Sequence, residues 1–475
     1  MRTREVVGMH ELAVEKLRNR IDGSVITAID ADFDQARRSW NADIDRRPGA
    51  VVQCATARDV VAAIGYGRDH DLEIAVRGGG HSFPGHSMCE GGVVVDLGRM
   101  NGVRVDPRSR RARVQGGALL RDLDAATQQH GLAVPAGIVG HTGVGGLTLG
   151  GGMGWLSRRG GLTIDHLVGA EVVTANSQIR HASASNEPDL FWALRGGGGN
   201  FGVVTEFEFD LIEVDPMVQF GLFFWGAGQG RDAHVAMRDL VRDLPLSLNA
   251  IQLAAFTAPP APFVPTEFQG LAGTGLMLVG FDDLDAHREV TDRLRRTVPP
   301  LFDVVTPMPY VALQQLLDEA NGWGFYAYDK GGYFAEIDDD VIEVLTTVGP
   351  RKGSPMSLAS IYPLDGAYSE VADETTAFSG GRSPRSFMTM IAMTSTSELL
   401  PAERAWVREL FEALEPHMLG DGAYVNVLSD TDEVHLSRSY GSKYPRLQEI
   451  KSTYDPDNVF HGNANIRPLV ATPEE

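Results

Sequence analysis

The stretch Arg77-Gly-Gly-Gly-His-Ser-Phe-Pro-Gly-His86 is a turn built almost without side chains, with one histidine inside it. The apolar runs 72–76 before it and 91–97 after it each predict a short buried strand. Three consecutive glycines expose backbone N–H groups, and they let an anionic group approach more closely than any Cβ would allow. The stretch therefore predicts a phosphate-binding turn between two strands; the alternative is a glycine-rich loop that only turns the chain.

Composition narrows the class of protein. The 475 residues are enough for two or three domains, and 43% hydrophobic with 22% charged residues is ordinary for a globular protein. The formal net charge of −21 argues against nucleic acid or an anionic membrane as partner. An anionic cofactor must then be held by local backbone dipoles.

The cysteines and the N-terminus indicate the compartment. Cys54 and Cys89 have no metal-ligand spacing, so no metal site is expected, and two free thiols are favoured over one disulfide. Residues 1–23 predict a polar, partly amphipathic helix rather than a signal peptide, and no run of about twenty apolar residues occurs. We therefore expect a cytoplasmic protein.

Regular elements surround the glycine turn. A strand at 51–55, a capping box from Thr56 to Asp59 and a helix to about residue 70 predict a βαβ unit with the strand 72–76. Residues 24–50 are interpreted as a surface segment. Further along, the pattern predicts a hairpin (102–105 and 111–115), helices at 118–131 and 187–195, and strands at 167–175 and 203–212.

Two more glycine clusters follow. Pro135–Gly154 has nine glycines in twenty residues and no charged residue, which disfavours an unbroken helix or strand and favours a loop buried against a cofactor. The other cluster is 196–202. Beyond Pro216 helices (231–243, 283–296, 401–414) alternate with strands (218–225, 275–280, 386–394), which indicates a second, α+β domain. The chain ends with a helix at 444–453 and the polar stretch Asn463-Ala-Asn-Ile466.

These clusters and the C-terminal segment resemble the berberine-bridge-enzyme-like flavin oxidases of the vanillyl-alcohol-oxidase superfamily. The matching signatures are 77–82, 144–154 with 157–159 and 161–162, 191–206 and 440–466; the middle of the chain matches weakly. The resemblance implies an α+β, two-domain flavin oxidase fold. Its FAD-binding domain has two small α/β subdomains from both chain ends, and its substrate domain contains a large antiparallel sheet. The expected division is 1–212, 213–428 and a returning segment 429–475.

The resemblance also implies a covalent flavin. His81 matches the histidine that is bonded to the flavin 8α-methyl carbon. Val139 stands where many relatives have a cysteine bonded to flavin C6, so a single link is expected, as in the nicotine-oxidising relatives. The expected cofactor-binding residues are Arg77, Gly78, Gly79, Gly80, His81, Ser82, Gly85, His86, Val139, His141, Thr142, Gly143, Gly146, Leu147, Gly150, Gly151, Gly154, Val203, Tyr444, Asn463 and Asn465.

The expected reaction is hydride transfer from a small substrate with a C–OH or C–N bond to flavin N5, followed by reoxidation by O2 to give H2O2. Asn463 or Asn465 would stabilise negative charge on the flavin pyrimidine ring. In the family a tyrosine often serves as the base, in a strand that ends near the flavin ring. The corresponding stretch here is 423–429, and Val427 stands where that tyrosine would be. The candidate catalytic residues are His141, Tyr326 and Tyr362, with Tyr328 and Tyr424 as further candidates for the base.

Several alternatives stay open. One is a flavin-dependent dehydrogenase with poor oxygen reactivity, because Thr142 replaces the small or apolar residue thought to influence oxygen access in relatives. Others are a tailoring flavoenzyme that forms a C=C or ring bond, and a flavin-binding protein without catalysis. A nicotinamide dehydrogenase is disfavoured, because 143–150 does not give GxGxxG at a strand–helix junction. A monomer or homodimer is expected.

Overall fold

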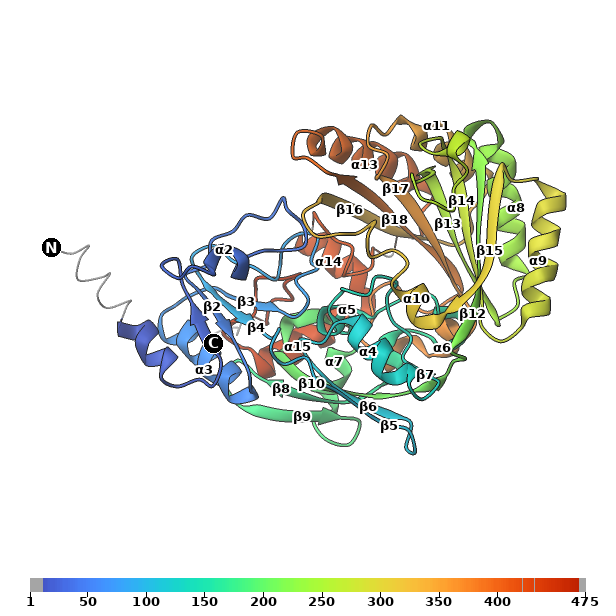
Figure 1. Cartoon of the computed structure of the whole chain (residues 1–475). Helices are drawn as coiled ribbons and strands as arrows, with labels where there is room; N and C mark the ends of the chain where they lie inside the picture. The colour runs from blue at the N-terminus through green and yellow to red at the C-terminus, as the bar shows by residue number, and fades with distance from the viewer. Residues whose placement is uncertain (1–11, 421, 431, 470–475) are drawn as a thin grey trace, which may run out of the picture.

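The computed structural model describes residues 12–420, 422–430 and 432–469 (Figure 1). The predicted N-terminal helix is seen from residue 12 to residue 18, and its first eleven residues lie outside the described part. No helix within the described ranges is both long and apolar enough to cross a membrane.

The first sheet contains the βαβ unit and has the strand order β1-β2-β4-β3. β2, β4 and β3 are parallel, and β1 adds antiparallel to β2. The side chain of Thr56 accepts the N–H of Asp59 and caps α3, as predicted. Bounds of the elements are β1 Ser24–Ile26, α2 Phe33–Ala36, β2 Ala50–Gln53, α3 Ala57–Asp69, β3 Ile74–Arg77 and β4 Val93–Asp96.

The second sheet is antiparallel, with the order β5-β6-β10-β8-β9. β10 alternates buried and half-exposed residues along most of its length, so one face of the sheet packs on a core and the other faces solvent. The elements of this part of the chain are β5 Val103–Asp106, β6 Arg111–Gln115, α4 Leu120–Gln128, β7 Leu132–Ala133, α5 Val144–Gly150, α6 Ser157–Gly160, β8 Leu167–Val173, β9 Ile179–Ser183, α7 Pro188–Leu194, β10 Val203–Asp210 and β11 Ile212–Glu213. β7 and β11 pair with each other in a separate two-stranded sheet.

The third sheet has seven antiparallel strands, in the order β15-β12-β14-β13-β17-β18-β16. α8 and α9 run along its outer face, next to α11 and α13 (Figure 1). The predicted fold class, with its large antiparallel sheet, is confirmed. Its elements are β12 Met217–Gly226, α8 Gly230–Arg242, β13 Leu248–Thr257, β14 Ala272–Gly280, α9 Leu284–Thr297, β15 Phe302–Pro309, α10 Tyr310–Gln314, β16 Tyr326–Phe334, α11 Asp339–Thr347, β17 Leu358–Leu364, α12 Ala367–Glu370, β18 Arg385–Thr394 and α13 Leu400–Leu414.

The C-terminal segment returns to the N-terminal part, and Figure 1 shows the red helices α14 (Glu433–Tyr440) and α15 (Tyr444–Tyr454) among its blue and green elements. Leu447 of α15 shares a hydrophobic core with Phe207 of β10. Lys451 and Asp455 form a fully buried ion pair of 2.6 Å, and Nζ of Lys451 also donates to the carbonyl of Asn200 at 2.8 Å. These contacts fasten the end of the chain to the third glycine cluster.

Three sequence-based interpretations were wrong. The segment 24–50 is not a surface segment: 24–26 is a strand of the first sheet, and the side chain of Trp40 is completely buried. Part of the second glycine cluster is the helix α5, because its glycines alternate with Val144, Leu147 and Leu149, which give it apolar contacts. The stretch 423–429, which matched a strand of relatives, is a turn.

Candidate functional site

A cavity of about 360 Å³ lies where the three glycine clusters meet. It is lined by residues from segments 74–87, 142–153, 198–207, 424–426 and 460–464, so both ends of the chain contribute. The predicted cofactor-binding residues that line it are Gly78, Gly79, Gly80, His81, Ser82, His86, Thr142, Gly143, Gly146, Leu147, Val203 and Asn463.

The first two glycine clusters touch backbone to backbone. A Cβ placed on Gly79 would lie 2.3 Å from the nitrogen of Gly143, and one on Gly143 would lie 2.3 Å from the nitrogen of Gly79. Gly146 is different, because a Cβ placed there meets no protein atom within 4 Å and points into open space. Gly79 and Gly143 are therefore needed for packing, and Gly146 leaves room in the cavity.

His81 is held between two rings. The ring of Trp40 stacks on it at 4.5 Å between centroids and 19° between planes. Its Nε2 lies 2.9 Å from Nδ1 of His141. Burial, and after it the proximity of His141, lowers the pKa of His81 to about 3, so the ring is neutral at physiological pH. A neutral imidazole has one nitrogen with a free lone pair and can act as a nucleophile.

Several predicted residues do not line the cavity but support its walls. Arg77 pairs with Asp96 at 2.6 Å behind the first turn. Gly85 packs on Ile44, Gly150 on Asn426, Gly151 on Phe378 and Gly154 on the carbonyl of Ala136, all closer than a Cβ would permit. Val139 and Asn465 are not among the lining residues, and Tyr444 stacks on Tyr440 in the core.

The candidate tyrosines lie on different faces of the third sheet. Tyr326 and Tyr328 pack against the cluster that contains α11 and α13, on the outer face of the third sheet. Tyr362 packs with Tyr424, which lines the cavity. Tyr424 accepts the N–H of Gly152 at 2.9 Å and of the Asn426 amide at 2.8 Å. Burial raises the pKa of Tyr362 and of Tyr424 to about 12, so neither is a phenolate at neutral pH.

Asn426 and Trp40 are among the residues at the site that were missed from the sequence. Asn426 lines the cavity, and its amide donates to the carbonyl of Leu147 at 3.2 Å as well as to Tyr424. The sequence feature that could have indicated Asn426 is its position two residues after Tyr424. Trp40 stacks on His81 from a segment rich in aspartate and arginine, and a lone tryptophan among charges was the only indication.

Known proteins are similar in sequence to this chain over nearly its whole length. Residues 48–183 match the family model described as FAD binding domain, and 423–467 match the model described as berberine and berberine like. An FAD-linked oxidoreductase of Aspergillus terreus is 37% identical over 489 residues, covering 96% of this chain and 95% of that protein. The (R)-6-hydroxynicotine oxidase of Paenarthrobacter nicotinovorans is 29% identical, covering 94% of this chain and 97% of that protein.

Solved structures agree. The crystal structure of 6-hydroxy-D-nicotine oxidase from Arthrobacter nicotinovorans matches with a TM-score of 0.84 and 26% identity, over 94% of this chain and 98% of that one. The fold and the glycine-lined cavity thus define a two-domain flavin enzyme. The chain belongs to the berberine-bridge-enzyme-like family of FAD-linked oxidoreductases, which confirms the resemblance drawn from its motifs.

The lining residues fit FAD. Among the described residues, no protein acceptor pairs with the N–H groups of Gly78, Gly79 and Gly80, which leaves them free for a pyrophosphate. The buried Oδ1 of Asn463 has no hydrogen-bond partner in the described part of the chain either. An orphaned polar atom and unpaired backbone donors in one cavity, which the open face of Gly146 enlarges, are what a polar dinucleotide would satisfy.

Proposed function

We propose that this enzyme oxidises a small organic substrate at a C–OH or C–N carbon by hydride transfer to FAD, with O2 as the final acceptor and H2O2 as product. Bound FAD supplies the hydride acceptor. The observation that carries the proposal is a neutral His81 that lies in the glycine turn at the cavity and pairs with His141. His81 forms the single covalent bond to the cofactor, at its 8α-methyl carbon.

The chain offers no second attachment. Val139 has only carbon atoms in its side chain and cannot form a thioether. Cys54 and Cys89 are buried in the first sheet region, and burial raises the pKa of both thiols, so neither is available as a thiolate. A flavin linked through one histidine is what these residues support.

The candidate bases of this chain favour an amine substrate. Val427 cannot accept a proton, and Tyr424 and Tyr362 both keep theirs at neutral pH. His141 is engaged with His81. An alcohol needs a base to remove its hydroxyl proton, whereas a neutral amine can transfer hydride without one.

A dehydrogenase that reacts poorly with oxygen is the second candidate. It is favoured by Thr142, which lines the cavity at the position linked to oxygen access in relatives. The two candidates share FAD, His81 and the substrate step, and they differ only in the acceptor.

Acid precipitation of the purified protein tests the covalent bond. A yellow pellet supports it, and colourless protein with free flavin in the supernatant refutes it. The His81→Ala variant is expected to release its flavin in acid. Anaerobic bleaching of the flavin by panels of amines, secondary alcohols and sugars identifies the substrate class, and peroxide release on turnover in air separates oxidase from dehydrogenase.

We also propose that the chain divides at 212 and 428 into FAD-binding, substrate-binding and returning segments. The third sheet supports this division, because all of its strands lie between 217 and 394. Most of the cavity lining supports it as well, since it comes from 74–207 and 460–464, and only 424–426 contribute from the end of the substrate-binding segment.

A further inference from the structure

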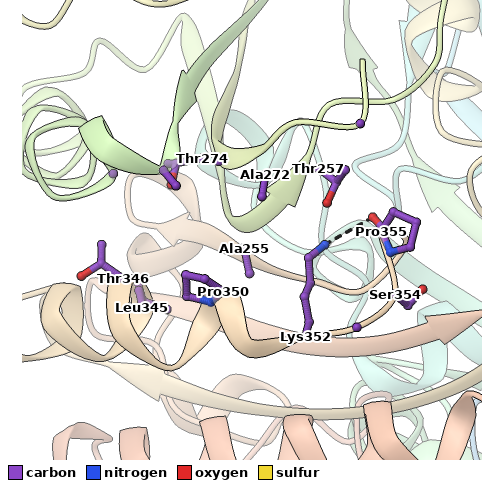
Figure 2. Close-up of a pocket in the computed structure, with 15 residues that line it drawn as sticks. Ala255, Thr257, Ala272, Thr274, Leu345, Thr346, Pro350, Lys352, Ser354 and Pro355 are labelled. Atoms are coloured by element: carbon purple, nitrogen blue, oxygen red, sulfur yellow. Dashed lines mark hydrogen bonds between the residues drawn. The ribbon is translucent and has the colours of Figure 1, made fainter. Parts of the chain in front are cut away.

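Another cavity, of about 240 Å³, lies at one end of the third sheet and shares no lining residue with the glycine-lined cavity. It is enclosed by the ends of β13 and β14, the start of α8, the end of α11 and the loop 350–355 (Figure 2). Much of its wall is glycine and alanine, and its neutral polar side chains are the hydroxyl groups of Thr257, Thr274, Thr346 and Ser354.

Strand β13 bends to open this space. Its pairing with β14 shifts register between Leu253 and Phe256. Ala255, inside that bulge and in the cavity wall, has a φ of +51°, in the left-handed region that side chains other than glycine rarely adopt. Such a conformation is unfavourable for a residue other than glycine and persists where the surroundings impose it, often beside functional sites.

Lys352 is the only charged residue among the described residues that line this cavity. Its Nζ donates to the carbonyls of Pro355, at 3.3 Å, and of Ser357. Figure 2 shows the side chain extended toward Pro355 and Thr257. A neutral amine has two N–H bonds, which the two carbonyls satisfy, so its lone pair is left over for a ligand.

The loop that carries this lysine is fixed by Glu403 of α13, whose Oε1 accepts the N–H groups of Gly353 at 2.7 Å and Ser354 at 2.9 Å. Burial lowers the pKa of Lys352 to about 8, although Glu403 acts in the opposite direction. A substantial fraction of the amine is therefore neutral at pH 8.

None of the other four lysines is among the residues that line this cavity, and the two buried ones are held in ion pairs. The sequence contains five: Lys16, Lys330, Lys352, Lys443 and Lys451. Lys443 and Lys451 are buried in ion pairs with Asp373 and Asp455. Lys16 is exposed, and Lys330 lies 4.5 Å from the ring centroid of Phe411.

We propose that Lys352 is a reactive amine that captures a small polar aldehyde in this cavity as an imine. The nitrogen lone pair adds to the carbonyl carbon, and one amine proton moves to the carbonyl oxygen. Loss of water then leaves the C=N bond, and no electrons are transferred to or from the pair. The threonine hydroxyls hydrogen-bond the polar group of the aldehyde. This site does not depend on the flavin chemistry proposed above.

Reductive trapping tests the proposal. The holoenzyme is incubated at pH 8 with glycolaldehyde and sodium cyanoborohydride, and the adducts are mapped by peptide mass spectrometry. We expect Lys352 to be labelled at least tenfold faster than Lys330, a half-buried lysine, with a rate that is half-maximal near pH 8.

Variants test whether labelling requires the cavity as well as the amine. Lys352→Arg removes the dominant adduct, and Lys330→Arg keeps it. Ala272→Phe, which fills the cavity, is expected to slow labelling of Lys352 at least tenfold with unchanged circular dichroism and flavin content. Equal labelling of Lys352 and Lys330 by glycolaldehyde, or undiminished labelling of Lys352 in the Ala272→Phe variant, would each overturn the proposal.

Discussion

His81 and His141 are linked ring to ring, with Nε2 of His81 2.9 Å from Nδ1 of His141. On its other side, Nε2 of His141 lies 3.3 Å from the carbonyl oxygen of Asp318. A carbonyl only accepts, so Nε2 of His141 carries a proton, and we expect its Nδ1 to accept from His81. His81 is then protonated on Nε2, and the lone pair of its Nδ1 is free.

This relay predicts which nitrogen of His81 holds the flavin. We expect the bond at Nδ1, which amino-acid flavin isolated by proteolysis and examined by NMR would reveal. His141→Ala is expected to slow covalent attachment about tenfold, because one hydrogen bond of about 1–1.5 kcal/mol no longer selects the reactive tautomer. The measurement is the covalent flavin fraction in denaturing gels over time after FAD is added to apoprotein.

A flavin bonded through Nε2, or unchanged attachment kinetics in the His141→Ala variant, would contradict this relay. His130→Ala is the matched control, since that histidine lies in the turn after α4 and is not among the residues that line the cavity. It is expected to attach flavin at the wild-type rate.

The second prediction is that a substitution of Gly146 reduces cofactor binding without weakening the fold. Gly146→Ala meets no protein atom within 4 Å and lies in the helix α5, so the stability of the apoprotein should stay the same or rise by up to about 1 kcal/mol. The methyl group occupies cavity space, so flavin content should fall at least tenfold. Absorbance after gel filtration measures the flavin, and urea unfolding measures the stability.

Gly228→Ala is the control for this substitution, because a Cβ there also meets nothing within 4 Å but the residue is not part of the cavity. Full flavin content is expected. If Gly146→Ala also retained full flavin, the cofactor would not occupy the cavity at this point.

The sequence was most informative where backbone conformation decides the structure. Glycine runs and a capping threonine act locally, so the first turn, α3 and the placement of His81 at the cavity could be predicted. The pairing of His81 with Trp40 could not, because the two are 41 positions apart and no local signal connects them.

Strand register explains the other misses. Tyr326 and Tyr328 share one face of β16, and that face packs under α13 rather than toward the flavin cavity. Which face of a strand is turned inward depends on its pairing with β18, and a one-residue slip would reverse it. A list of tyrosines in the substrate domain therefore does not identify those at the site.

The buried pair Lys451–Asp455 supports the third prediction. Lys451→Met leaves the carboxylate of Asp455 without its cation in a fully buried position, which should reduce the free energy of unfolding by about 3–5 kcal/mol. Nζ of Lys451 also donates to the carbonyl of Phe460 at 3.0 Å, next to the cavity, so flavin content should fall as well. Urea denaturation with flavin fluorescence reports both changes.

Arg446→Ala in the same helix is the matched control. Its partner Asp189 and its own side chain are exposed, so we expect a loss below about 1 kcal/mol and normal flavin content. Comparable losses in the two variants would show that the buried pair is no more important than a surface pair.

The buried carboxyl group of Asp124 is expected to make the folding stability of the protein depend on pH. It is completely buried in α4 and accepts a hydrogen bond of 3.1 Å from the amide of Gln314 in α10. Burial raises the pKa of Asp124 from 3.8 to about 7. Below about pH 4 the folded and unfolded chains both hold the proton. Between about pH 4 and 7 only the unfolded chain releases it, so this group lowers stability as pH rises, and the penalty is constant above pH 7.

Asp124→Asn removes that titration and keeps an oxygen that can accept from Gln314. The stability advantage of the variant over wild type should grow from near zero at about pH 3.5 to about 2–4 kcal/mol at pH 8, at 1.36 kcal/mol per pKa unit with partial relaxation. Chemical denaturation at a series of pH values measures it. The exposed Asp69→Asn should differ from wild type by no more than about 0.5 kcal/mol throughout. An Asp124→Asn advantage that did not change with pH would mean that Asp124 is ionised in the folded protein as readily as in the unfolded chain.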